Sequence, residues 1–193
     1  MKNMNKCPVP ADPALHPALA GRFSPVLFDS ESTVTSIEVD VLLEAARRAP
    51  SAGNSQPWKF IVARRGDANH EQILRRLARS SSLWAPSASL LVVNLAHIFV
   101  EGTEDWDYSE FARYDLGQAV AHMTVQGLSM GLAAHQFRAF DRDGICSDFA
   151  VPSHWEVTSI TAFGTAIPCS DEVEAPGTSR ERLSLDEITW SRC

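Results

Sequence analysis

The stretch from Tyr108 to Leu132 is the feature that most constrains the fold of this chain. Its sequence, "YSEFARYDLGQAVAHMTVQGLSMGL", contains no proline, and its apolar residues recur at helical intervals on more than one face. A helix that is apolar on more than one side is stable only when other elements cover it. We therefore predict a long central helix, largely buried, with the rest of the chain packed around it.

The segments on either side of this helix alternate between helical and strand-like patterns. A capping box from Thr35 to Glu38 opens a predicted helix over about 36–48, and Pro50 ends it. Its apolar residues at helical spacing are Ile37, Val41, Leu42 and Ala45. A second helical period runs through "ANHEQILRRLAR", whereas "WKFIVARR", "SASLLVVNLA" and "VTSITAFGTAI" are typical of strands, and "LSLDEITW" of a strand-like or extended tail. This alternation alone does not distinguish an antiparallel sheet from a doubly wound parallel one.

Charge and cysteine content narrow the class of ligand and the compartment. The net charge is −7, with a pI near 5.3, so no global basic field attracts nucleic acid or an anionic membrane. We expect a small-molecule ligand, no nucleic-acid partner and no membrane partner. The cysteines contain no C-x-x-C pair and are expected to be free thiols in a reducing cytosol; they are Cys7, Cys146, Cys169 and Cys193.

The first twenty residues differ from the rest of the chain. They hold four prolines and no apolar core, which predicts a flexible or extended arm over 1–20 rather than a signal peptide. Residues 21–193 contain no linker long enough to divide them, so we expect one domain there. No apolar run approaches the length of a membrane span, and the predicted location is the cytoplasm.

One short motif, "GLSMG" from Gly127 to Gly131, matches the G-x-S-x-G pattern of serine hydrolases. That pattern requires a strand before the nucleophile, here Ser129, but the preceding residues have a helical period. A triad would also have to use Asp148 and His154, crowded near the end of the chain. We favour small residues at a close helix contact, and keep a serine hydrolase as the alternative outside the fold described below.

Metal and nucleotide motifs are missing from the sequence. No two of the six histidines lie three or four residues apart, and neither G-x-x-x-x-G-K-[ST] nor G-x-G-x-x-G after a strand occurs. We therefore predict no metal site and no nucleotide bound in the P-loop or Rossmann manner.

Three separated segments carry chemistry that fits together. In "GRFSP", Arg22 and Ser24 lie two residues apart, so in an extended chain both could hold a phosphate. The loop "APSAGNSQPWKF" offers the donors and acceptors of Ser51, Asn54 and Gln56 to a flat heterocycle. In "SRERL", two further arginines alternate onto one side, Arg180 and Arg182.

Ordered motifs along nearly the whole chain after the arm resemble the FMN-dependent nitroreductase family. They are "R-x-S-P", "EAARRAPSAGNSQPWKF", "YDLGQA", "GLAAHQFRAFD", "AFG" and "R-x-R-L", of which "NSQPW" is the most specific. The resemblance implies an α+β fold with a mostly antiparallel central sheet flanked by helices. It also implies an intertwined homodimer that binds one FMN per subunit at its interface.

The resemblance further assigns residues to the cofactor. Arg22, Ser24 and Arg182, supported by Arg180, would hold the phosphate and its ribityl neighbourhood. Loop residues would contact the ring or the ribityl chain from the other subunit, and a later segment would pass beside the ring with its backbone N–H groups reaching flavin N5 and O4. The loop residues are Pro50, Ser51, Asn54 and Gln56, and the later segment is Gln136, Phe137, Arg138 and Ala139.

The implied chemistry belongs to the cofactor. NADH or NADPH would reduce FMN, and an electron-poor acceptor such as a nitroaromatic or quinone would reoxidise it in a ping-pong cycle, so no catalytic side chain is assigned. A specialised flavoenzyme of the same fold, of the deiodinating, flavin-cleaving or azoline-oxidising type, is the alternative. Outside catalysis, a flavin-binding protein also remains open.

The chain departs from the family pattern at several positions. Val26 stands where many relatives carry a basic residue near flavin N1 and O2, and Ala139 replaces the usual glycine beside N5. Ser81 and Trp84 replace an asparagine and a lysine that help to hold the ring edge. His135 and Gln136 are either compensating polar neighbours of the flavin or packing residues. These departures suggest an altered flavin potential or an altered second substrate.

Overall fold

The computed structural model describes residues 15–103, 105–167 and 180–192. The helices are α1 (Pro17–Ala20), α2 (Ser36–Arg47), α3 (Ala68–Leu74), α4 (Arg79–Ser82), α5 (Ala112–Ser129), α6 (Arg142–Asp148) and α7 (Leu185–Ile188). Two 3-10 turns are η1 (Ala52–Asn54) and η2 (Ala85–Ser87), and the strands are β1 (Trp58–Arg64), β2 (Leu90–His97), β3 (Ala133–Phe137) and β4 (Trp155–Gly164).

The strands form a sheet in the order β1-β2-β4-β3, with every neighbouring pair antiparallel. This confirms the α+β fold around an antiparallel central sheet and excludes a doubly wound parallel one. Strand β3 follows α5 and takes an edge position beside β4, so its outer side has no neighbouring strand among the described residues.

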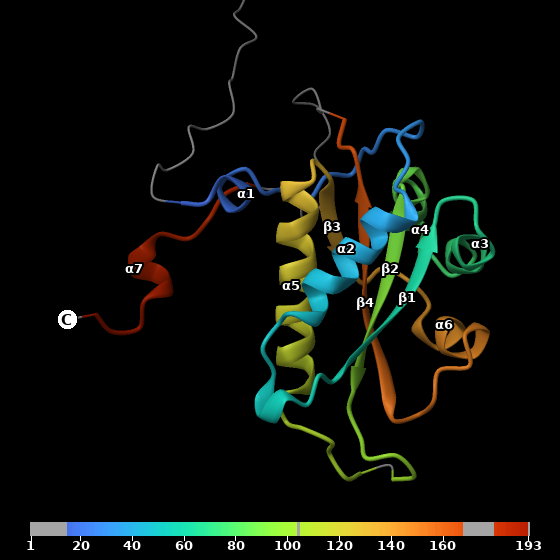
Figure 1. Cartoon of the computed structure of the whole chain (residues 1–193), viewed down its shortest axis with the longest axis vertical. Helices are drawn as coiled ribbons and strands as arrows, with labels where there is room; N and C mark the ends of the chain where they lie inside the picture. Colours follow the sequence, from blue (N-terminus) through green and yellow to red (C-terminus); the bar gives the residue numbers. More distant parts are fainter. Residues whose placement is uncertain (1–14, 104, 168–179, 193) are drawn as a thin grey trace, which may run out of the picture.

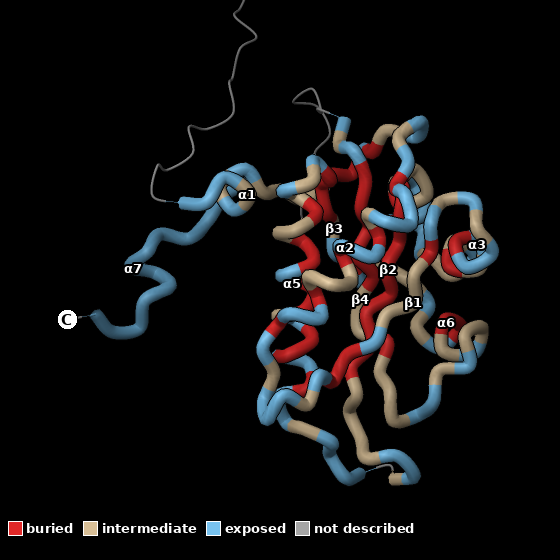
Figure 2. The backbone as a smooth tube through the Cα atoms, viewed as in Figure 1, coloured by how far each residue is buried: buried red, intermediate tan, exposed pale blue. Residues whose placement is uncertain are grey.

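Helices cover both faces of the sheet (Figure 1). Helices α2 and α5 pack on one face, where Leu90 and Val92 of β2 belong to their core cluster. The opposite face, with Leu91 and Val93, packs against α3, α6 and the segment around η2. Because successive strand residues point to opposite faces, a strand that is apolar on both, as β2 is apart from Asn94 and His97, is buried on both sides. Figure 2 shows this burial as red stretches along the strands and on parts of α5.

Helix α5 confirms the predicted long, largely buried central helix, although it begins at Ala112 rather than near Tyr108. Gly127 explains how closely it approaches the sheet, because a Cβ at this position would lie 3.0 Å from the Phe163 ring. The preferred interpretation of "GLSMG", small residues at a close helix contact, is confirmed at Gly127.

Helix α2 begins with the predicted capping box: Thr35 Oγ1 accepts from the Glu38 N–H, and the Glu38 carboxylate accepts from the Thr35 N–H. The Thr35 N–H and hydroxyl, which both donate to this carboxylate, hold the pKa of Glu38 below its usual value. Its buried face differs from the predicted spacing, because Val39, Leu42 and Ala46 are buried whereas Ile37 is 74% exposed. The face that packs across α5 decides which apolar residues are covered, and the first turn of α2 extends beyond that contact.

Two other segments differ from their sequence patterns. The helical period of "ANHEQILRRLAR" ends at Leu74, and a second short helix, α4, follows only at Arg79. The tail "LSLDEITW" contains the helix α7 instead of an extended strand, because Ser184 and Glu187 form a capping box at its start. The strand-like expectation for this tail was wrong.

The first and last described segments differ in how they lie against the main body. Within the predicted arm over 1–20, residues 17–20 form α1, which packs near α5, and residues 1–14 fall outside the described ranges. The segment around α7 extends away from the body and is exposed along its length (Figures 1 and 2). None of the helices in the described ranges is long and apolar enough to cross a membrane.

Candidate functional site

A cavity of about 250 Å³ lies where the segment before Val26, strand β3 and helix α5 meet. It brings together Arg22, Ser24 and Gln136, three residues that the sequence assigned to one site. The remaining lining residues are Leu19, Ala121, Thr124, Val125 and Ala134. A wall of small apolar side chains with a few polar groups at one side is typical of a small-molecule site.

The polar side of this cavity is suited to an anion. Arg22 Nη1 lies 3.5 Å from Ser24 Oγ, and in the described part of the chain Arg22 forms no ion pair. Arg180 stacks on the ring of the intervening Phe23, with 4.2 Å between the guanidinium carbon and the ring centre. A second guanidinium is therefore next to the Arg22–Ser24 segment. Arg182 is exposed and donates to the Glu181 carbonyl oxygen.

The loop over 50–57 has an unusual backbone. Gly53, Asn54 and Gln56 all have positive φ, of 58°, 56° and 49°. Non-glycine residues rarely adopt this conformation, and such strain is concentrated at functional sites. The Gln56 N–H donates to Ser51 Oγ (3.0 Å), and the Gln56 side chain donates to the Asn54 carbonyl (3.2 Å). The loop thus holds its own exposed amides in a fixed arrangement.

Asp115 anchors this loop, and the sequence did not identify it. Its carboxylate is 2% exposed and accepts hydrogen bonds from the Ala52 N–H (2.9 Å) and from the Gln118 side chain (3.3 Å). A carboxylate within the first turn of a helix predicted to be largely buried was the available signal. Tyr108 adds a second attachment, because its hydroxyl donates to the Ser55 carbonyl (3.3 Å).

An aromatic stack supports the Tyr108 attachment. The His97 ring lies between those of Tyr108 and Trp155, with ring centres 3.8 and 4.6 Å away. The backbone N–H of His97 donates to the Pro57 carbonyl. Burial, followed by the positive charges of His154 and Lys59, lowers the pKa of His97. A neutral imidazole is therefore favoured beneath the loop.

The loop is bound to the start of α5, whereas the cavity is lined by residues from the second half of this helix. Asp115, which binds the loop, is in the first turn, whereas Thr124 and Val125 of the cavity are in the last turns. Asp115 and Thr124 are nine positions apart in α5, or about 13 Å along the helix axis. The two groups of predicted cofactor residues are thus not brought into one cavity within a single chain.

His135 and Gln136 occupy opposite faces of β3, so they do not act as a pair. Gln136 faces α5, where its amide donates to Thr124 Oγ1 (3.3 Å). His135 faces the other layer, with Nδ1 2.8 Å from the Pro25 carbonyl oxygen and its ring stacked on Trp84 at 4.3 Å. Burial lowers the pKa of His135. The packing interpretation therefore holds for His135, and Trp84 is part of the same packing.

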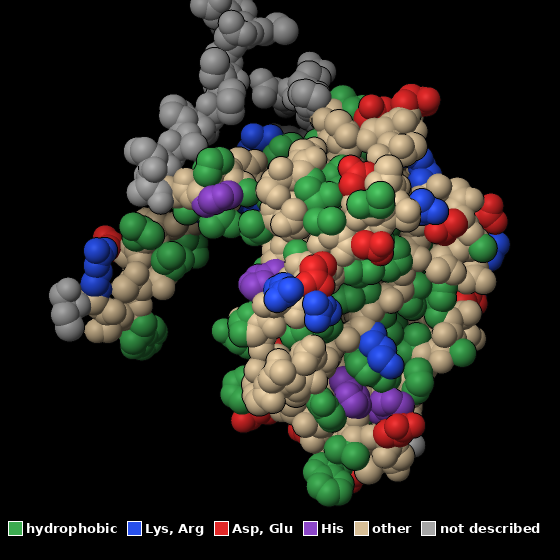
Figure 3. Space-filling view, viewed as in Figure 1, with side chains coloured by type: hydrophobic (Ala, Val, Ile, Leu, Met, Phe, Trp, Pro, Cys, Tyr) green, Lys and Arg blue, Asp and Glu red, His purple; other side chains and the backbone are tan. Residues whose placement is uncertain are grey.

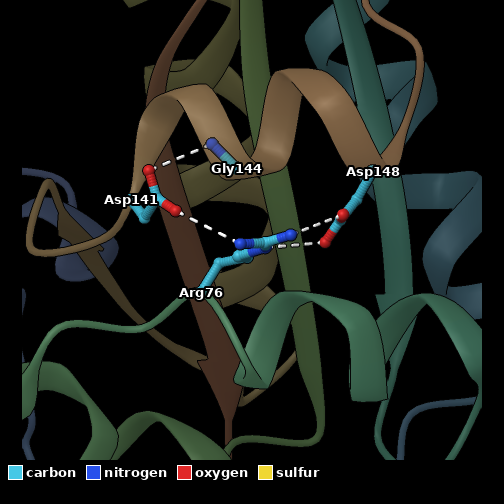
Figure 4. A network of polar contacts seen from close by, with 4 residues as sticks. All are labelled: Arg76, Asp141, Gly144 and Asp148. Carbon is cyan, nitrogen blue, oxygen red and sulfur yellow. Dashed lines mark hydrogen bonds and ion pairs between the residues drawn. The ribbon is translucent and has the colours of Figure 1, made fainter.

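The segment after β3 is fixed by polar contacts to the residues between α3 and α4. Arg76 forms a two-pronged ion pair with Asp148, with both N–O distances 2.7 Å, and also lies 3.4 Å from Asp141 (Figure 4). Asp141 in turn caps α6 by accepting from the Gly144 N–H (3.0 Å), and its own N–H donates to the Arg76 carbonyl. The hydrogen bonds from Arg76 hold the pKa of Asp148 below its usual value.

The structure does not support the serine hydrolase alternative. Ser129 lies at the C-terminal end of α5, and its hydroxyl donates to the Gln126 carbonyl. The residues directly before Ser129 belong to α5 and not to a strand. Asp148 forms an ion pair with Arg76 rather than a contact with His154. Over residues 15–103, 105–167 and 180–192, no cluster of three or more His, Cys, Asp or Glu could hold a metal ion.

The chain is similar to several known proteins. A family model described as "Nitroreductase family" matches residues 19–96. An uncharacterised 15.4 kDa protein of Mycolicibacterium smegmatis is 33% identical over 144 residues, covering 69% of this chain and 95% of that protein. The oxygen-insensitive NADPH nitroreductase of Helicobacter acinonychis is 30% identical over 74 residues, covering 38% of this chain and 35% of that enzyme. A crystal structure described as an oxidoreductase containing FMN is 25% identical, with a TM-score of 0.82 and coverage of 98% and 96%.

Proposed function

The chain belongs to the nitroreductase family, and from that premise we propose that it is an FMN-dependent oxidoreductase. Its electron donor would be NADH or NADPH, and its acceptor an electron-poor small molecule such as a nitroaromatic or a quinone. When bound, FMN supplies the hydride chemistry at N5, and the protein supplies binding and orientation.

The observation that carries this proposal is the shared cavity of Arg22, Ser24 and Gln136. A phosphate needs a cation and hydrogen-bond donors, and Arg22, which has no ion pair with any described residue, provides both together with the Ser24 hydroxyl. Arg180, stacked on Phe23, adds positive charge next to the Arg22–Ser24 segment. The Gln136 amide would then orient the ligand beyond the phosphate. The residues present therefore fit FMN.

We further propose that the loop over 50–57 reaches the cofactor from a second copy of the chain. Within one chain, this loop and the cavity lie at opposite ends of α5. The segment around α7 also has a surface suited to a partner. The α7 segment is at the left of Figure 3, and its exposed apolar residues are Leu183, Leu185, Ile188 and Trp190. A homodimer with FMN at its interface would bury them and join the two groups of residues.

Absorption spectroscopy tests the proposal directly. The purified protein should be yellow, with flavin absorption that is released as FMN on denaturation. Anaerobic addition of NADH or NADPH should bleach the bound flavin, and a nitroaromatic or quinone should restore the colour. A colourless protein that cannot be reconstituted with FMN would overturn the proposal. If neither nucleotide reduces the bound flavin, the protein is still a flavoprotein, but the proposed NAD(P)H-dependent activity is wrong.

A further inference from the structure

Ser81 is buried next to the segment that follows β3. It is 1% exposed, and its hydroxyl oxygen lies 2.5 Å from the carbonyl oxygen of Ala139. The Ala78 N–H donates to the same oxygen (3.0 Å). Ser81 Oγ also lies 3.0 Å from the Ala78 carbonyl, but a hydroxyl has one proton, and the shorter contact directs it to Ala139. The Ala139 carbonyl thus accepts two hydrogen bonds.

These bonds continue through two peptide groups. The Phe140 N–H, which shares a peptide group with the Ala139 carbonyl, donates to the Arg138 carbonyl (3.0 Å) and closes a three-residue turn. The Arg138 carbonyl shares its peptide group with the Ala139 N–H. That last N–H has no acceptor among the described residues. The series therefore runs from the Ser81 hydroxyl to a backbone donor that is left available.

Such a series has two physical effects. Hydrogen bonds that follow one another polarise each peptide group, so the terminal N–H becomes a stronger donor than an isolated one. The direction of that N–H is also fixed. Leu77 pairs with Phe140, the last residue of the turn, and the N–H of the following Asp141 donates to the Arg76 carbonyl (2.7 Å), so the end of the turn is held.

We propose that Ser81 is a positioning residue for the flavin. Acting through the Ala139 carbonyl, it aims and strengthens the Ala139 N–H as a donor to the ring edge, where the family resemblance places the segment over 136–139. This inference rests on the proposed function. It gives Ser81 a role different from direct contact with the ring, because its hydroxyl is buried and already donates to Ala139.

The test compares three variants of the FMN-loaded protein. Ser81→Ala removes the hydroxyl, and Ser81→Cys fills the same space with a weak donor. Ser82→Ala is the matched control, because the neighbouring Ser82 is exposed and its hydroxyl donates only to the Arg79 carbonyl of its own helix. The readouts are the affinity for FMN and the affinity of the bound flavin for sulfite, which adds at N5 and bleaches the colour.

Both Ser81 variants should bind FMN and sulfite about two- to tenfold more weakly, the range expected for losing one hydrogen bond, and Ser82→Ala should match the wild type. A purely structural role would lower stability without changing sulfite affinity in the protein that stays folded. Unchanged affinities in Ser81→Ala, or full recovery in Ser81→Cys, would overturn the inference.

Hydrogen exchange separates this inference from the proposed function. In the wild type, FMN binding should slow exchange of the Ala139 amide. If FMN binds and that amide is not protected, the inference fails and the proposed function stands. If the wild type does not bind FMN at all, both fail.

Discussion

The Asp115 carboxylate accepts a hydrogen bond from the Ala52 N–H at 2.9 Å, which ties the first turn of α5 to the strained loop over 50–57. In Asp115→Ala the Ala52 N–H would lose its acceptor. We expect the free energy of unfolding to fall by about 1–3 kcal/mol. We also expect weaker retention of FMN, because the loop would lose its anchor. Urea unfolding and the fraction of flavin retained on gel filtration measure the two effects.

Asp115→Asn is the control for this prediction. The asparagine side chain keeps an oxygen that can accept from the Ala52 N–H, so Asp115→Asn should lose less stability than Asp115→Ala. If Asp115→Ala unfolds at the same urea concentration as the wild type, the anchoring role is wrong.

Arg22 is expected to contribute most of the charge that holds the FMN phosphate. In Arg22→Gln the charge-assisted hydrogen bonds to the phosphate would be lost, and FMN should bind about ten- to a hundredfold more weakly. The affinity can be measured from flavin fluorescence during titration. Arg47→Gln is a suitable control, because Arg47 is an exposed arginine paired with Glu44 on α2. If the two variants bind FMN with equal affinity, Arg22 does not hold the phosphate.

The fold could be predicted where the signal is local. The capping box at Thr35, the mainly apolar run of β2 and the proline-free stretch of α5 each specify an element through neighbouring residues. The tail was misjudged although its signal was also local, because Ser184 and Glu187 form a capping box of the same kind. The buried face of α2 could not be predicted from the sequence, because it depends on how α2 crosses α5.

The site could be predicted in its residue types more than in its arrangement. Arg22, Ser24 and Gln136 do meet at one cavity. Asp115 and Ser81 act across 63 and 58 positions of sequence, and no periodicity or spacing connects such distant partners. His135 and Gln136 illustrate the same limit, because adjacent residues in a strand face opposite layers once the sheet has formed.

Stability should depend on the protonation of His135. Burial lowers its pKa in the folded protein, whereas in the unfolded chain the pKa is near the ordinary value of about 6.5. The unfolded chain therefore takes up the proton first as the pH falls. The stabilising contribution is present above pH 6.5 and is lost as the pH falls through the lower folded pKa.

His135→Phe isolates this effect, because it preserves a ring against Trp84 and removes the titration. The free energy of unfolding should decrease between pH 7.5 and 5.5 more steeply in the wild type than in His135→Phe. Identical pH dependence of the two proteins would exclude a contribution from His135.

Gly144 is required by the polar contacts of Figure 4. A Cβ at this position would lie 2.1 Å from Asp141 Oδ2 and 2.7 Å from Arg76 Cδ, so the carboxylate that caps α6 would have to move. Loss of the cap and the crowding should together lower the free energy of unfolding of Gly144→Ala by about 2 kcal/mol. Urea unfolding followed by circular dichroism measures the loss.

Gly117→Ala is the matched control, because a Cβ there has no neighbour within 4 Å. Alanine is the better helix former, so this variant should be stabilised by up to about 1 kcal/mol. Asp141→Ala removes the colliding carboxylate, and in that background Gly144→Ala should cost less than it does in the wild type. If the cost is the same in both backgrounds, the collision with Asp141 is not its cause, and the loss would have to come from the Arg76 side of the contact.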